Sequence, residues 1–108
     1  MANAFKNSFQ KSVGVNPATL YTAGAGVQAT VVGMSLSNVT ASDIRADVYI
    51  TSSGTDYYIV KDATIEPGSA LIPIGGDQKV VLEATDAIKV VSDTSTSMDA
   101  ILSVLEIS

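Results

Sequence analysis

The chain has 108 residues, a net charge of −5 and no His, Cys or Trp. Without Cys and His it cannot form a disulfide, a thiolate metal site, a Ser-His-Asp triad or a Cys-His dyad. Six Lys and Arg against eleven Asp and Glu argue against nucleic-acid binding, which needs clustered basic residues.

The remaining composition is that of one globular domain. Hydrophobic residues make up 46% of the chain, enough for a core in a domain of this size. No apolar run approaches the roughly 20 residues that cross a membrane as a helix, and the first residues lack the apolar run of a secretory signal. We therefore expect no enzyme activity, no catalytic residue, no cofactor, no metal ligand and no membrane partner.

The first segment, residues 1–15, is polar apart from Phe5 and Phe9. It fits an edge strand of the domain, and it also fits an arm that leaves the domain to pair with a neighbour. The edge strand is the simpler interpretation. Residues 16–108 are expected to form the domain itself.

From residue 20 onward the apolar residues alternate with polar ones, which is typical of half-buried strands. The expected strands are residues 20–22, 27–37, 44–51, 57–61, 70–74, 79–82, 87–91 and 100–107. Turn-forming residues recur every ~8–12 positions, including a hairpin tip at 53–56 and a turn at 75–77. We predict a single antiparallel β-sandwich of roughly seven to nine strands, immunoglobulin-like or jelly-roll-like in layout.

The alternation also predicts which residues form the core. The expected core members are Val32, Met34, Leu36, Ile44, Val48, Ile50, Ile59, Leu71, Leu82, Ile88, Val90, Leu102 and Val104. The last strand is apolar on both faces, with Ile101, Leu105 and Ile107 on one and Ala100, Leu102 and Val104 on the other. Such a strand is central in a packed sheet or lies at a subunit interface, and the central position is favoured.

Several short motifs are typical of binding, catalytic or modification sites, but each lacks the surrounding features that such a site needs. Residues 24–29 fit a permissive G-x-G-x-x-A motif, but a strand pattern follows where a dinucleotide site needs a helix. The oxygen-rich loop 92–99 has only Asp93 and Asp99 as charged ligands for calcium, so a solvated loop is the better interpretation. Two carboxylate pairs, Asp43 with Asp47 and Asp56 with Asp62, are better explained as surface charges that accept backbone hydrogen bonds. Asn38 begins a glycosylation sequon, with no export signal to support its use.

The tyrosines and the residual apolar residues are candidates for contacts between subunits. Tyr49 shares its strand face with Arg45 and Asp47, so we expect it at the surface, where packing between strands is favoured over an interface role. The candidate interface residues are Phe5, Phe9, Tyr49, Tyr57, Tyr58, Leu105 and Ile107.

The chain resembles small β-rich virion structural proteins of tailed bacteriophages, in particular marine and cyanobacterial phages. The segments that carry the resemblance are LYT (20–22), ATVVGMSLSN (29–38), DYYIVK (56–61), PGSAL (67–71), GGDQKVVLEATDAIKVVSD (75–93) and SVLEIS (103–108). The likeness covers residues 18–108, and no catalytic residues come with it. Family members place Gly before Asp in a turn where this chain has Thr85 before Asp86.

The resemblance implies a non-enzymatic component of the virion. It would be a capsid decoration or cement protein that self-associates as a homo-oligomer and docks on coat subunits. A neck or tail protein is the alternative within the virion, and a carbohydrate- or receptor-binding module is the alternative outside structural roles. The implied partners are other virion proteins, with no nucleic acid and no membrane.

Overall fold

The computed structural model describes residues 3–75 and 79–107, and every regular element in these ranges is a β-strand. The predicted turn at 75–77 falls partly on residues 76–78, which lie outside the described residues. The strands are β1 (Asn3–Val13), β2 (Ala18–Thr22), β3 (Gln28–Asn38), β4 (Ile44–Ser52), β5 (Thr55–Ile65), β6 (Ala70–Ile74), β7 (Val80–Leu82), β8 (Ala87–Ser92) and β9 (Met98–Ile107).

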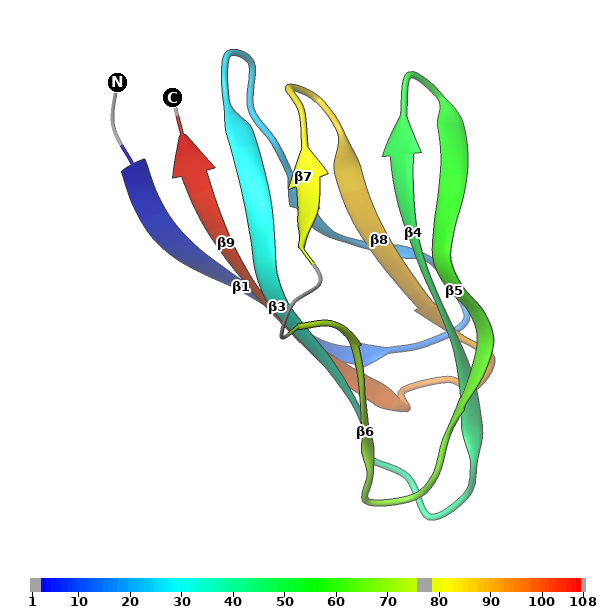
Figure 1. Ribbon diagram of the computed structural model, residues 1–108. Helices are drawn as coiled ribbons and strands as arrows, with labels where there is room; N and C mark the ends of the chain where they lie inside the picture. The colour runs from blue at the N-terminus through cyan, green and yellow to red at the C-terminus, as the bar shows by residue number, and fades with distance from the viewer. Residues whose placement is uncertain (1–2, 76–78, 108) are drawn as a thin grey trace.

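The strands form two antiparallel sheets that pack face to face (Figure 1), so the predicted β-sandwich is confirmed. Sheet A has five strands: four follow the order β1-β9-β3-β6, and β7 pairs with residues 29–31 of β3, beside β6, which pairs with residues 34–37. Sheet B has four strands in the order β2-β8-β4-β5. Because the chain crosses repeatedly between the sheets, most sheet neighbours are distant in sequence.

The core lies between the sheets and is built from the inward positions of both. Of the predicted core, Met34, Leu36, Ile44, Val48, Leu82, Ile88, Val90, Leu102 and Val104 are buried, and Ile50, Ile59 and Leu71 are partly buried against them. Sequence reasoning missed Val13, Leu20, Ala23, Ala29, Val31, Ala46, Ile65, Ile74, Met98 and Ala100 as core members.

The assignment of Val32 to the core is wrong, because Val31 occupies the buried position instead. The pairing of β3 with β9 shifts between Val31 and Gly33, so Val32 is the extra residue of a β-bulge. A bulge reverses which alternate positions point inward. Val31 therefore faces the core on one side of the bulge, and Met34 faces it on the other.

The two terminal strands lie side by side in sheet A. β9 lies between β1 and β3, so the interpretation of the last strand as central is confirmed. β1 pairs with β9 from Asn3 to Val13 and lies at the edge of the sheet (Figure 1). Only Val13 of β1 is buried, and the strand is therefore held mainly by its backbone pairing.

The turn between β7 and β8 contains a strained residue. Thr85 has a φ of 72°, a conformation that costs a β-branched residue roughly 1–2 kcal/mol. Its backbone N–H donates to the Ala23 carbonyl at 2.8 Å, which holds it in place.

We predict that Thr85→Gly stabilises the protein by about 0.5–1 kcal/mol, because glycine adopts this conformation freely and keeps the backbone bond. Thermal unfolding followed by circular dichroism measures the effect. Thr64→Gly is the matched control: Thr64 is exposed in β5 and has no positive φ, so this change should destabilise. Equal losses of stability in both variants would contradict the prediction.

Candidate interaction surface

Four of the predicted interface residues share the outer face of sheet A. In the pairing of β1 with β9, Phe5 lies opposite Leu105, Asn3 opposite Ile107 and Phe9 opposite Ile101. The neighbouring inward positions, such as Leu102 and Val104, are buried in the core. Because side chains alternate along a strand, Phe5, Phe9, Leu105 and Ile107 point away from the core on the same side.

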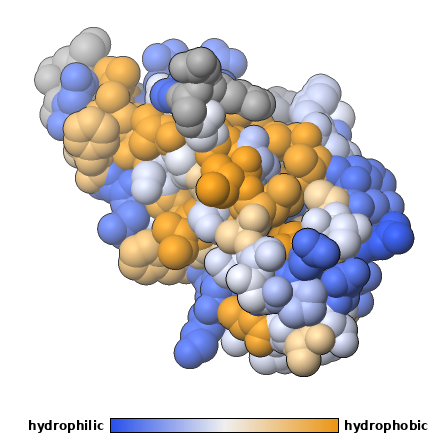
Figure 2. All heavy atoms as spheres, turned by 60° about the horizontal axis from the view of Figure 1, so that its bottom comes forward, coloured by the Kyte–Doolittle hydropathy of each residue, from blue (hydrophilic) through white to orange (hydrophobic). Residues whose placement is uncertain are grey.

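Two further members of this face were not among the candidate interface residues, although the sequence pattern had already placed Ile101 on the same strand face as Leu105 and Ile107. Ile101 pairs with Phe9. Val81 lies in the same row as Leu105, because Thr30 of β3 pairs with Leu105 on one side and with Val81 on the other. The exposed fractions are 79% for Phe5, 65% for Phe9, 58% for Val81 and 48% for Ile101. We call the residues Phe5, Phe9, Val81, Ile101, Leu105 and Ile107 the outer A face. Figure 2 shows apolar residues gathered over a broad area of this side of the molecule.

Tyr49 is not at the surface as predicted, since only 7% of it is exposed. It projects from the outer face of sheet B, but its ring packs against Tyr58 with 5.0 Å between centroids. Lys61 lies in turn over the Tyr58 ring, 4.7 Å from its centroid. Burial is the main cause that raises the pKa of Tyr49, and the nearby Asp56 carboxylate adds to it. Tyr49 thus points outward but is covered by the Tyr58 ring, which agrees with the interpretation that it packs between neighbouring strands.

The two adjacent tyrosines of β5 lie on opposite faces of sheet B. Tyr58 pairs with Tyr49 on the outer side, and Tyr57 pairs with Ile50, which packs against the core. Both are exposed because β5 is an edge strand. They therefore do not form one aromatic platform, and neither belongs to the outer A face.

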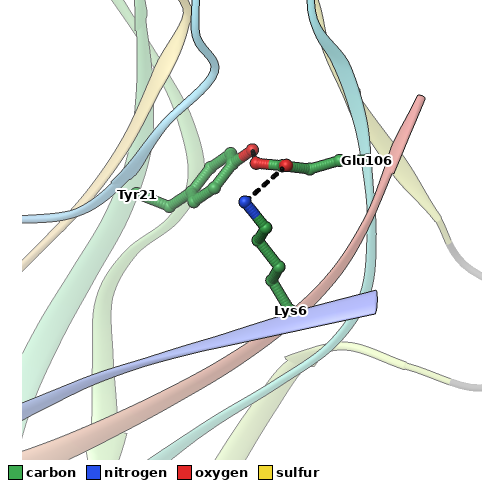
Figure 3. Close-up of polar contacts among 3 residues, drawn as sticks. All are labelled: Lys6, Tyr21 and Glu106. Carbon is green, nitrogen blue, oxygen red and sulfur yellow. Dashed lines mark hydrogen bonds and ion pairs between the residues drawn. The ribbon is translucent and has the colours of Figure 1, made fainter. Parts of the chain in front are cut away.

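A polar cluster joins the two sheets beside β1 (Figure 3). The Tyr21 hydroxyl of β2 donates to Oε2 of Glu106 on β9, and Lys6 Nζ of β1 lies 3.0 Å from Oε1 of the same carboxylate. These contacts hold the pKa of Glu106 below its usual range, the Tyr21 bond being the larger cause. Burial first, and then the Glu106 bond and charge, raise the pKa of Tyr21 well above its ordinary value of 10.0.

This cluster predicts a loss of stability in alkali. The raised pKa of Tyr21 means that the folded state favours the neutral phenol, so its contribution is complete below pH 10 and is lost as pH rises above 10. Tyr21→Phe should therefore show a shallower fall of the urea midpoint between pH 9 and 11.5 than the wild type. Tyr49 also has a raised pKa, so some alkaline loss should remain in this variant. A slope identical to that of the wild type would contradict the role of Tyr21.

Three of the carboxylates singled out in the sequence accept backbone hydrogen bonds. Asp93 accepts from the Arg45 backbone at 2.9 Å, which is the main cause lowering its pKa, and Asp99 accepts from the Ser12 backbone at 3.0 Å. Asp47 accepts from the Asp62 backbone at 2.7 Å. Within residues 3–75 and 79–107, no group of three or more acidic side chains could hold a metal ion.

The glycine motif at residues 24–29 is a turn followed by a strand. The Val27 N–H donates to the Gly24 carbonyl at 3.1 Å, Gly26 has a φ of 75°, and β3 begins at Gln28. A dinucleotide site would need a helix N-terminus at this point.

No helix in the described part of the chain is long and apolar enough to cross a membrane.

Comparison with known proteins shows a likeness of fold alone. No family model matches the chain, and no curated protein matches its sequence. A solved structure of a Bacillus endospore appendage, described as belonging to a novel family of disulfide-linked pili, is similar with a TM-score of 0.58. The match covers 99% of this chain and 87% of the other at 9% sequence identity. The chain therefore shares its β-sandwich architecture with a protein that forms pili.

Proposed function

We propose that the chain is a non-enzymatic structural subunit that assembles with other subunits through the outer A face. The observation that carries the proposal is the difference between the outer faces of the two sheets. A sheet that packs on a core with one face normally presents polar residues on the other. Sheet A presents two phenylalanines and several aliphatic residues instead.

The outer face of sheet B behaves as a solvated face should. Its β4 positions alternate as Arg45, Asp47 and Tyr49, and Lys89 pairs with Tyr49 from β8. Asp47 also lies 3.6 Å from Lys61 in an ion pair. Because this face is charged and the outer A face is apolar, the two faces suit different surroundings. An exposed aromatic and aliphatic patch is the usual mark of a protein contact surface.

The fold likeness to a pilus protein supports an assembly role. That protein is described as disulfide-linked, whereas this chain has no Cys. Contacts between copies of this chain would therefore lack disulfide bonds and would depend on a surface that buries apolar area on association. The resemblance to phage virion proteins favours a virion component, either a capsid decoration or cement protein or one of the neck or tail.

The alternative of carbohydrate or receptor binding receives less support. A sugar site commonly uses aromatic rings gathered on one face, whereas Tyr57 and Tyr58 lie on opposite faces of β5. The Asp93 and Asp99 carboxylates, which a calcium-dependent site would need, already accept backbone hydrogen bonds.

The proposal is tested on purified virions or appendages of the source that encodes the chain. Quantitative mass spectrometry should find it in many copies per particle. Hydroxyl-radical labelling should modify Phe5 and Phe9 at least several-fold less in the particle than in the isolated chain. Tyr57, which is 59% exposed on the other sheet, is the internal control for labelling. Absence from the particles, or equal labelling of the phenylalanines in both states, would overturn the proposal.

A further inference from the structure

The outer A face has two apolar ridges with a hollow between them. One ridge runs across the sheet through Phe5, Leu105, Thr30 and Val81, and the other runs through Phe9 and Ile101. Phe5 and Phe9 are four positions apart on β1, so the ridges lie about 13 Å from each other.

The row between the ridges consists of Asn7, Ser103 and Gly33, with the bulge residue Val32 beside Gly33. Ser103 of β9 pairs with Asn7 on one side and with Gly33 on the other. Apart from the chain neighbours of Gly33, which include Val32, no heavy atom lies within 4 Å of a Cβ placed at this glycine. A depression of about 250 Å³ on the β1–β9 side of this row is lined by Phe5, Lys6, Asn7, Ser103 and Val104. A second depression of about 280 Å³ lies beside Phe9 and Ile101 and is also lined by Lys11 and Asp99.

The ridge residues are uncharged, and the charges beside them are of both signs, which matters for pairing with an identical surface. Lys6 lines the first depression and lies 3.0 Å from the Glu106 carboxylate, and Lys11 and Asp99 line the second. The chain has a net charge of −5, so two copies repel each other over most orientations. In a two-fold interface each patch meets itself, and any charge near the axis meets its own like charge. The outer A face limits this penalty, because its ridges are uncharged and the charges beside them are balanced in sign. The outer face of sheet B carries Arg45 and Lys89 as well as Asp47 along its central strands.

We infer that the occupant of the outer A face is a second copy of this chain, packed sheet against sheet, which presupposes the assembly role proposed above. A ridge of one copy lies in the hollow of the other, and the two outer faces approach to the roughly 10 Å spacing of packed sheets. The outer A face thus offers to a second copy both the apolar ridges and the depressions that receive them.

The exposed apolar side chains supply a large part of the area that such a pair needs. A covered aromatic side chain buries about 150–250 Å², and Phe5 and Phe9 are 79% and 65% exposed. With Val81 and Ile101, the exposed apolar side chains supply roughly half of the ~800 Å² per partner of a standard interface. The polar side chains of the same face, Asn7, Thr30 and Ser103, add to this area.

Sedimentation equilibrium of the purified chain tests the inference. The wild type should reach twice its monomer mass of 11.1 kDa in a concentration-dependent way. Ser103→Trp fills the hollow and should raise the dimer Kd at least tenfold. Thr19→Trp, at an exposed position on the outer face of sheet B, is the matched control and should leave the Kd unchanged.

Phe9→Ser provides a second test that does not depend on how the sheet tolerates a tryptophan. It removes a 65% exposed ring and should also raise the Kd at least tenfold while the circular dichroism spectrum stays unchanged. A monomeric wild type at millimolar concentration, or wild-type Kd values in both outer-A-face variants, would overturn the inference. If the isolated chain is monomeric but Phe5 and Phe9 are protected in particles, a different subunit covers the face and the structural role stands. If the chain dimerises but is absent from particles, the structural role fails and the dimer stands.

Discussion

Leu102→Ala should lower the free energy of unfolding by about 2–5 kcal/mol. Leu102 is 0% exposed and lies in β9, the strand that joins β1 and β3 in sheet A. Its side chain belongs to the core cluster between the sheets, so truncation leaves a cavity that the surrounding strands cannot fill completely. A small domain has only about 5–15 kcal/mol of stability, and urea denaturation followed by circular dichroism should therefore show a large shift.

Ile101→Ala is the matched control on the same strand. Ile101 is 48% exposed on the outer A face, so the same kind of truncation should cost the monomer less than about 1 kcal/mol. The change should instead weaken association, because it removes part of a ridge. A loss of monomer stability as large as that of Leu102→Ala would contradict the assignment of the two faces of β9.

The strands and their inward residues were largely predictable because they depend on local alternation. Ile44, Val48 and Leu102 could be assigned to the core from the period-two pattern alone, and the structure confirms them. The pattern failed at Val32, where a bulge shifts the register of β3. Two adjacent valines carry no signal that says which one is the extra residue.

The outer A face could be predicted only in part, because it depends on pairing between distant segments. The apolar faces of residues 1–15 and 100–107 were visible separately, and Phe5, Phe9, Leu105 and Ile107 followed from them. Val81 joins the same row only because β3 lies between β9 and β7, and strand order is not encoded in periodicity. The prediction that Tyr49 lies at the surface was wrong for a related reason, because the Tyr58 ring that covers it comes from the neighbouring strand.

Asn38 shows how a local motif can conceal a structural role. Its sequence context is that of a glycosylation sequon, yet the residue is 3% exposed. Its Nδ2 donates to the Ser42 and Ile65 carbonyls at 2.7 and 2.8 Å, and its Oδ1 accepts from the Thr40 N–H and hydroxyl, both at 2.8 Å. The side chain thereby joins the end of β3, the following loop and the end of β5.

Asn38→Asp should lower the free energy of unfolding at pH 7 by about 3–5 kcal/mol. The substitution keeps the shape of the side chain and the oxygen that accepts from Thr40. It replaces the amide nitrogen, which donates to the Ser42 and Ile65 carbonyls, with a carboxylate oxygen. A buried charge then faces two acceptors with no donor between them. Thr40→Ser keeps the hydroxyl and is the control, with an expected cost of less than about 1 kcal/mol.

The pH dependence of the Asn38→Asp variant separates this mechanism from a general loss of packing. Burial beside two carbonyl oxygens should raise the pKa of the new carboxyl in the folded state. The folded variant then binds a proton more tightly than the unfolded chain. Its loss of unfolding free energy relative to the wild type should therefore shrink as pH falls from 7 toward the ordinary Asp value near 3.9.

The wild type itself loses stability in acid, because the folded state lowers the pKa values of Glu106 and Asp93. The informative quantity is therefore the difference between variant and wild type at each pH, measured by urea unfolding at pH 7 and 4.5. A difference that does not change with pH would show that the amide protons of Asn38 do not stabilise the junction between β3 and β5.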